Sequence, residues 1–237
     1  MIGFYYNACG NTFLVVDNLN KNLSDSDKNK IVLKYVIDKD GVIFVQDHFM
    51  DYYNRDGKRA DFCGNGARTY FAYINSKFEI NEYTFNSYSG EIRGFIKDTY
   101  YVSMPKIINK GEKSYKGIDG SLVQVGVPHF VIERNTENIN WNEFIPLRNY
   151  FDANINIYEE INTGFLRIRT FERGVERETG ACGSGSTATA YCYREKTKYD
   201  LIKLKTNGGS LKVLFSDTYA FLGGGVEKCS EELELLL

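Results

Sequence analysis

The feature that most limits how this chain can fold is an internal repeat. DFCGNGARTYFAY, starting at Asp61, and GACGSGSTATAYCY, starting at Gly180, share a Cys-Gly-x-Gly turn followed by small, apolar and aromatic residues. Cys182 follows Cys63 by 119 residues (182 − 63), about half of the 237-residue chain. Repeats of this kind indicate that one structural unit has been copied. We therefore predict an internal duplication.

Two further matches fall on the same offset. Gly90 falls on Gly209, and the tripeptide Asp-Thr-Tyr at 98–100 falls on the same tripeptide at 217–219. Between the halves, residues 106–119 are polar and contain glycine, which is typical of a junction. We expect an N-terminal half of residues 1–106 and a C-terminal half of residues 107–227. The tail, 228–237, is a candidate addition to the first half.

Both halves have the same order of sequence patterns. Alternating apolar residues predict strands before each Cys-Gly-x-Gly turn, and a helix of about three turns follows it. The expected strands are 13–17, 42–46, 52–53, 122–132, 155–158 and 165–171, and the expected helices are 67–77 and 186–195. One helix among many strands favours an α/β fold of two pseudo-symmetric domains, each with a mixed or antiparallel sheet wrapped around a central helix.

The composition excludes several classes of partner. The chain is 43% hydrophobic and 25% charged, which is typical of an ordinary soluble protein. A formal net charge of −2 gives no basic excess for nucleic acid, so a small solute is the expected partner. The first residues lack a cationic leader, and no apolar run reaches membrane-spanning length. We expect a cytoplasmic protein without membrane contact.

The cysteines and histidines bear on redox state and metal binding. Five cysteines are an odd number, and no C-x-x-C pair occurs, so reduced thiols are expected rather than a disulfide framework. The only histidines are His48 and His129, and no Cys/His cluster suggests a metal site. No pyridoxal signature is visible, and no cofactor is expected.

The repeated loop has three interpretations. In the first interpretation, the cysteines are small buried residues at the starts of helices. In the second, 183–188 fits the G-x-G-x-x-A pattern of nucleotide sites, although a polar run precedes it where a buried strand is needed. The third uses the unpaired N–H groups and positive field of a helix N-terminus, which bind anions and favour a thiolate.

The third interpretation uses both halves together. A duplicated fold would bring two anion-binding helix ends, each with a cysteine, to face each other across a cleft. One substrate carboxylate would then have a thiol on each side of its α-carbon. One thiolate removes the α-proton, and the other thiol returns a proton to the opposite face. The N–H groups around the carboxylate would stabilise the developing carbanion.

Several segments resemble one family, the diaminopimelate epimerases, which are pyridoxal-independent amino-acid epimerases. The resemblance lies in DFCGNGAR (61–68), ERGVERETGACGSG (172–185), GNTFLVVDN (10–18), NRDG (54–57) and VPHFV (127–131). It spans nearly the whole chain. It implies an isomerase that interconverts L,L- and meso-diaminopimelate for lysine and cell-wall synthesis, with a small amino acid as substrate. A homodimer is left open.

The resemblance also implies roles for individual residues. Cys63 and Cys182 are the implied acid/base thiols. Backbone donors to the reacting carboxylate would come from Gly64, Asn65, Gly183 and Ser184. The other implied substrate-binding residues are Asn11, Asn54, Asn154, Glu172 and Arg173. A guanidinium suits a distal carboxylate, and a glutamate with amide oxygens suits an ammonium group.

Departures from the family pattern concern the distal end of the substrate. Val127 stands where the family usually has asparagine, and one extra residue lies between Arg173 and Cys182. Glu176 or Arg177 are therefore alternatives to the Glu-Arg pair at 172–173. Two other functions stay open: a racemase of another amino acid such as histidine, and a non-catalytic small-molecule binding protein of the same fold.

Overall fold

The computed structural model describes residues 1–236. By their contacts these residues form two compact units. Unit 1 comprises Met1–Ser103 together with the chain from Gly224 onward, and unit 2 comprises Met104–Gly223. None of the helices within residues 1–236 is long and apolar enough to cross a membrane.

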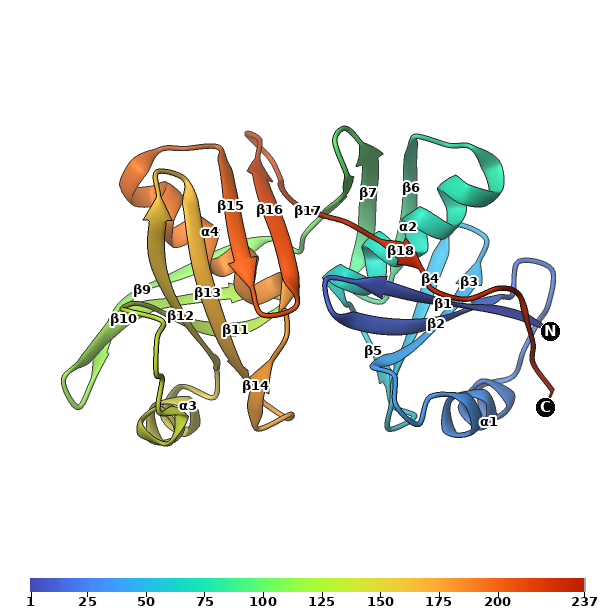
Figure 1. The fold of residues 1–237 in the computed structure, drawn as a ribbon, viewed down its shortest axis with the longest axis horizontal. Coiled ribbons are helices and arrows are strands. Elements are labelled where there is room, and N and C mark those ends of the chain that lie inside the picture. The colour runs from blue at the N-terminus through green and yellow to red at the C-terminus, as the bar shows by residue number, and fades with distance from the viewer. Residues whose placement is uncertain (237) are drawn as a thin grey trace. The chain divides into compact units, whose positions relative to one another are not determined.

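Unit 1 is a sheet with two helices (Figure 1). Its strands are β1 (Ile2–Ala8), β2 (Asn11–Asp17), β3 (Gly41–Gln46), β4 (Phe49–Asn54), β5 (Arg59–Ala60), β6 (Glu82–Ser87), β7 (Gly90–Ile96) and β8 (Tyr100–Ser103). Its helices are α1 (Asp25–Tyr35) and α2 (Gly64–Phe78). Two short C-terminal strands, β18 (Glu227–Lys228) and β19 (Leu233–Glu234), pair with β1.

Unit 2 is built in the same way. Its strands are β9 (Ile107–Tyr115), β10 (Ile118–Val125), β11 (Val127–Glu133), β12 (Asn154–Asn162), β13 (Phe165–Glu172), β14 (Arg177–Thr179), β15 (Leu201–Thr206), β16 (Gly209–Phe215) and β17 (Ala220–Gly224). The helices are the 3-10 turn η1 (Trp141–Glu143), α3 (Ile145–Phe151) and α4 (Gly183–Thr197).

Strand pairing confirms the predicted duplication. In unit 1, β2 runs parallel to β3 and β4 runs parallel to β6, while β1–β2, β3–β4, β4–β5 and β6–β7 are antiparallel. In unit 2 the strands from β10 to β16 repeat this scheme pair by pair. Each unit is therefore a mixed sheet of the expected class.

The central helix of each unit is α2 or α4, and strands surround it (Figure 1). Every residue of α2 from Gly64 to Ile74 is buried, and the helix contacts β1–β4, β7 and β8. In unit 2, α4 contacts β10–β13, β15 and β16. Both helices begin three residues before the predicted start, because Cys63 and Cys182 themselves cap them.

The expectation of a single helix in each half was wrong. Ser24 caps α1 by accepting a hydrogen bond from the backbone N–H of Asp27, and Pro146 lies in the first turn of α3. On α1, Ile31 and Val32 are buried in the cluster that contains Leu14, Val42 and Phe44. Ser24 followed by two acidic residues was the available signal for α1.

One junction prediction and one strand prediction also need correction. The polar segment 106–119 is not a loose junction but most of the β9–β10 hairpin, which turns at Lys116-Gly117 with positive φ at both residues. Such paired left-handed residues suit a two-residue hairpin turn. The strand expected over 122–132 is two strands, because the chain reverses at Gly126 (φ +70°).

The C-terminal tail belongs to the core of unit 1. Leu235 is 2% exposed and packs in the cluster that includes Leu14 and Val16. The N-terminal amino group donates to the Leu235 carbonyl at 2.9 Å. By contacts, the chain leaves unit 1 after Ser103 and returns to it at Gly224.

Candidate active site

The two Cys-Gly-x-Gly loops have the same local geometry in their separate units. Cys63 has extended backbone (φ −142°, ψ 116°), and its Sγ accepts from the N–H of Gly66 at 3.4 Å. Cys182 has φ −119° and ψ 112°, and its Sγ accepts from the N–H of Gly185 at 3.4 Å. Each thiol therefore caps a helix N-terminus, where the positive end of the helix dipole favours a thiolate.

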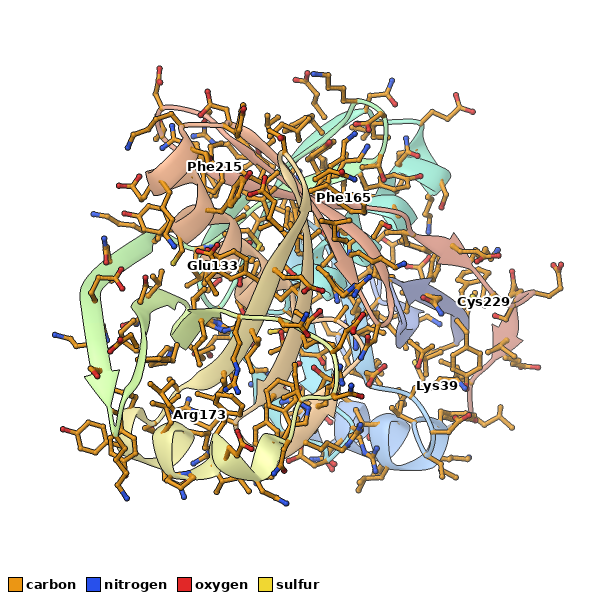
Figure 2. All side chains as sticks on the ribbon, turned by 60° about the vertical axis from the view of Figure 1, so that its left-hand side comes forward. Lys39, Glu133, Phe165, Arg173, Phe215 and Cys229 are labelled. Carbon is orange, nitrogen blue, oxygen red and sulfur yellow. The ribbon has the colours of Figure 1, made fainter. Side chains whose placement is uncertain are left out.

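The cysteines differ in exposure. Cys63 is partly exposed, and Cys182 is 8% exposed. Cys192 is buried in the middle of α4, where burial raises its pKa to about 11, so it stays protonated near neutral pH. Cys229 lies on the surface (Figure 2). None of the five cysteines forms a disulfide within residues 1–236, and these residues contain no cluster of three or more His, Cys, Asp or Glu for a metal ion.

Side chains of unit 1 join Asn11 to the first turn of α2. Asn65 is 2% exposed, and its Nδ2 donates to Oδ1 of Asn11 at the start of β2. The Oδ1 of Asn65 accepts from the guanidinium of Arg68 at 2.7 Å. Arg68 is fully buried, and no sequence pattern had singled it out. Gly64 lies beside Asn65 in the same buried turn.

Asn54 reaches the same end of the sheet through strand order. It ends β4 opposite Gly41, which begins β3, and Gly41 in turn pairs with Phe13. Phe13 lies two residues after Asn11 on β2. Because β2 and β3 are parallel and β4 is antiparallel to them, Asn11 at the start of β2 and Asn54 at the end of β4 lie at the same end of the sheet.

In unit 2, Asn154, Glu172 and Arg173 meet at the corresponding strand ends. The Oδ1 of Asn154 accepts from the backbone N–H of Arg173 at 2.7 Å. Glu172 accepts from the hydroxyl of Thr179, three residues before Cys182. The guanidinium of Arg173 pairs with Asp152 at 2.6 Å, beside α3 (Figure 2). Gly183 and Ser184 form the first turn of α4.

Strand register places the extra residue that the sequence shows before Cys182. Tyr53 pairs with Arg59, four residues before Cys63, and Phe171 pairs with Glu178, four residues before Cys182. The extra residue therefore lies in the hairpin turn at 173–176. Glu172 then occupies the position of Asn54, one residue after the paired aromatic. Of the alternatives, Glu176 forms an ion pair with Arg148 on α3.

His129 belongs to a buried polar network that the sequence did not reveal. Its Nδ1 lies 3.1 Å from Nδ2 of Asn156, and Oδ1 of Asn156 accepts from the hydroxyl of Thr170 at 3.1 Å. With the amide held this way, Nδ1 accepts and the proton is on Nε2, which has no hydrogen-bond partner within residues 1–236. Burial, and next the charge of Arg173, lower the pKa of His129 to about 3.

The low pKa of His129 predicts acid sensitivity. The unfolded chain binds a proton at this histidine below its ordinary pKa of about 6.5, whereas the folded chain does not until about pH 3. Stability is therefore present above pH 6.5 and falls with pH, by about 2 kcal/mol between pH 7 and pH 5. Urea unfolding at both pH values should show this loss in the wild type and in His48→Gln. In His129→Gln the loss of stability between the two pH values should be smaller by about 2 kcal/mol. A loss in His129→Gln equal to that of the wild type would contradict the low pKa of His129.

Gly185 is required by close packing at the start of α4. A Cβ at this position would lie 2.2 Å from Oδ1 of Asn156, which its hydrogen bonds hold in place. At the matching Gly66, a Cβ would lie 3.3 Å from Cβ of Cys63, a contact that small shifts relieve.

Alanine substitutions test this difference. We expect Gly185→Ala to lower the free energy of unfolding by about 1–3 kcal/mol, because the buried amide must move. Gly66→Ala should be close to neutral, because alanine favours a helix interior. Urea unfolding measures both, and equal effects of the two substitutions would show that the contact with Asn156 is not limiting.

Comparison with known proteins places the chain in a family. Residues 4–107 match the family model described as diaminopimelate epimerase. A diaminopimelate epimerase of Thermotoga maritima is 43% identical over 235 residues, covering 96% of this chain and 99% of the relative. The chain belongs to the diaminopimelate epimerase family. A second diaminopimelate epimerase, from Campylobacter lari, is 33% identical over 244 residues, and the match covers 96% of this chain and 97% of the relative.

A solved structure outside the close relatives has the same fold. A phenazine biosynthesis protein of the PhzF family from Enterococcus faecalis superposes with a TM-score of 0.78. The two chains are 15% identical, and the match covers 99% of each. At this identity the likeness shows the fold alone. For this member of the diaminopimelate epimerase family, the departure from the family pattern at Val127 lies at the start of β11, where the side chain is 39% exposed.

Proposed function

We propose that this protein is a diaminopimelate epimerase that interconverts the L,L and meso isomers, with Cys63 and Cys182 as the two acid/base groups. The observation that supports these roles most strongly is the duplicated geometry of the two thiols. Each caps a buried helix and accepts from a backbone N–H at 3.4 Å. The relatives that carry the name diaminopimelate epimerase support the choice of substrate.

The proposed reaction moves one proton in and one proton out. A thiolate takes the α-hydrogen as a proton, so that the C–H electron pair stays on the α-carbon and its carboxylate. The thiol on the other face then gives its proton to this carbanion, and the configuration is inverted. After one turnover the thiolate and the thiol have exchanged places. The proton balance needs no cofactor. We also propose that the reaction takes place in the cytoplasm.

Helix N-termini offer the means to stabilise the carbanion. The first N–H groups of a helix have no partner within it, and they act best on charge that develops during the reaction. We assign this role to the backbone of the first turns of α2 and α4. The residues concerned are Gly64, Asn65, Gly183 and Ser184.

The distal amino and carboxylate groups need a different set of partners. We assign the distal carboxylate to Arg173, whose guanidinium already binds the carboxylate of Asp152 and would exchange it for that of the substrate. Glu172 and the amide oxygens at the strand ends suit the ammonium group. These amides belong to Asn11, Asn54 and Asn154.

Exchange of α-protons in deuterium oxide tests the proposed substrate. The reduced protein is incubated with L,L-diaminopimelate, L-histidine and other L-amino acids, and the α-proton signals are followed by NMR. We expect loss of the α-proton signal for diaminopimelate alone. Exchange only with another amino acid would instead establish a racemase, the alternative that the departure at Val127 keeps open. Absence of exchange with every compound would indicate a binding protein.

A further inference from the structure

Among the buried positions at which the two thiol loops differ, one differs in charge. Arg68 lies in α2 five residues after Cys63, and the residue five positions after Cys182 in α4 is Thr187. Both side chains are fully buried. Helix start, cap geometry and glycine spacing are otherwise alike, and the exposed Asp61, two residues before Cys63, falls on Gly180. The arginine is therefore the difference in buried charge between the loops.

Arg68 is a buried cation whose neutral partners do not balance its charge. Within residues 1–236 its Nη2 donates to Oδ1 of Asn65 at 2.7 Å, and its Nη1 donates to the carbonyl of Gly225 at 3.1 Å. Its Nε has no oxygen or nitrogen partner there. An arginine stays protonated in proteins, and a buried charge is costly unless an opposite charge lies near it.

Two thiols, those of Cys9 and Cys63, interact electrostatically with this guanidinium. Burial lowers the pKa of Arg68, while its interaction with Cys9, which includes a hydrogen bond, and the charge interaction with Cys63 act in the opposite direction. Cys9 lies in the β1–β2 turn with φ +54°, a backbone conformation that non-glycine residues seldom adopt. The groups that can supply negative charge to Arg68 are therefore these thiols in their thiolate form.

The charges around the Cys182 loop balance differently. Glu172 accepts from Thr179, and Arg173 is paired with Asp152, so a negative and a positive group oppose each other near this loop. His129, linked through Asn156 to the start of α4, is neutral. No buried guanidinium occupies the position of Thr187.

We propose that Arg68 is a positioning residue that makes Cys63, rather than Cys182, the thiolate of the resting protein. This inference rests on the proposed function, since it states which of the two catalytic thiols starts as the base. Cys182 then starts as the proton donor. Cys9 holds the guanidinium in place and takes no part in proton transfer.

Alkylation of the thiols tests this assignment without measuring activity. The wild type is treated briefly with iodoacetamide over a pH series, and modified Cys9, Cys63 and Cys182 are quantified by mass spectrometry of the digest. Only the thiolate reacts, so each pH midpoint reports one thiol. We expect the midpoint of Cys63 to lie at least about one pH unit below that of Cys182, which is about a tenfold difference in thiolate fraction. Equal midpoints, or a low midpoint only at Cys9, would overturn the proposal.

Variants of Arg68 provide the matched comparison. Arg68→Met should raise the midpoint of Cys63 to that of Cys182, whereas Arg68→Lys, which keeps the charge, should hold most of the difference. An unchanged midpoint in folded Arg68→Met also contradicts the proposal. If this variant does not fold, the comparison of the Cys63 and Cys182 midpoints in the wild type still tests the proposal. In α-proton exchange, the acid limb of the pH profile should move to higher pH together with the Cys63 midpoint in Arg68→Met. Failure of all exchange would refute the proposed function and leave the alkylation result intact.

Discussion

Replacing either Cys63 or Cys182 by alanine is expected to lower the rate of inversion of diaminopimelate by about 10²–10⁴-fold, the usual contribution of a positioned acid or base. In the proposed mechanism, each substitution removes the group that serves one face of the α-carbon. Neither thiol side chain is large, and each lies at the start of a helix rather than in its middle. The folded state should therefore persist, as circular dichroism would show.

The other cysteines provide controls for this result. Cys229→Ala changes an exposed residue and should leave the rate within a few-fold of the wild type. The same is expected of Cys192→Ser, since Cys192 is a buried residue of α4 whose high pKa keeps it protonated. A Cys63→Ala protein with full activity would refute the two-base assignment.

Replacing Asp51 by alanine is expected to have the largest effect on stability. Asp51 is fully buried on β4, where its carboxylate lies 2.7 Å from Nζ of Lys28 and 3.0 Å from Nε of Arg59. Removing one partner of a buried ion pair leaves an uncompensated charge and costs about 3–5 kcal/mol. The free energy of unfolding in urea should fall by this amount.

Asp25 is the matched control for Asp51. Both carboxylates contact the guanidinium of Arg59, but the side chain of Asp25 is 69% exposed. Solvent screens such a pair, so Asp25→Asn should barely move the urea midpoint. Similar losses in Asp25→Asn and Asp51→Ala would show that burial of the ion pair is not what matters.

The duplication could be predicted from the sequence because the repeated loop is a local sequence pattern. A cysteine followed by closely spaced glycines at a helix start depends on residues next to each other, and it fixes α2 and α4 in both units. The ion pair between the two strands that precede each loop could not be predicted from the sequence. Unit 1 has Asp51 on β4 and Arg59 on β5, whereas unit 2 has Arg169 on β13 and Glu178 on β14, with the signs reversed.

The missed features depend on tertiary burial. Strand β9 and the first residues of β10 carry mostly polar side chains, so alternation of apolar residues could not reveal this part of the hairpin. Arginine usually lies at the surface and histidine is intermediate, so only the folded structure shows that Arg68 and His129 are both fully buried. The register of β13 and β14 likewise required strand pairing before Glu172 could be aligned with Asn54.

The most direct test of the two-thiol account is where deuterium appears during inversion. L,L-diaminopimelate is converted by the reduced protein in deuterium oxide, the reaction is stopped early, and the isomers are separated. If Cys63 and Cys182 serve opposite faces, the meso product carries deuterium at the inverted carbon, while the recovered substrate keeps its α-hydrogen. Equal deuterium in recovered substrate and product would mean that a single base serves both faces, and it would contradict the account.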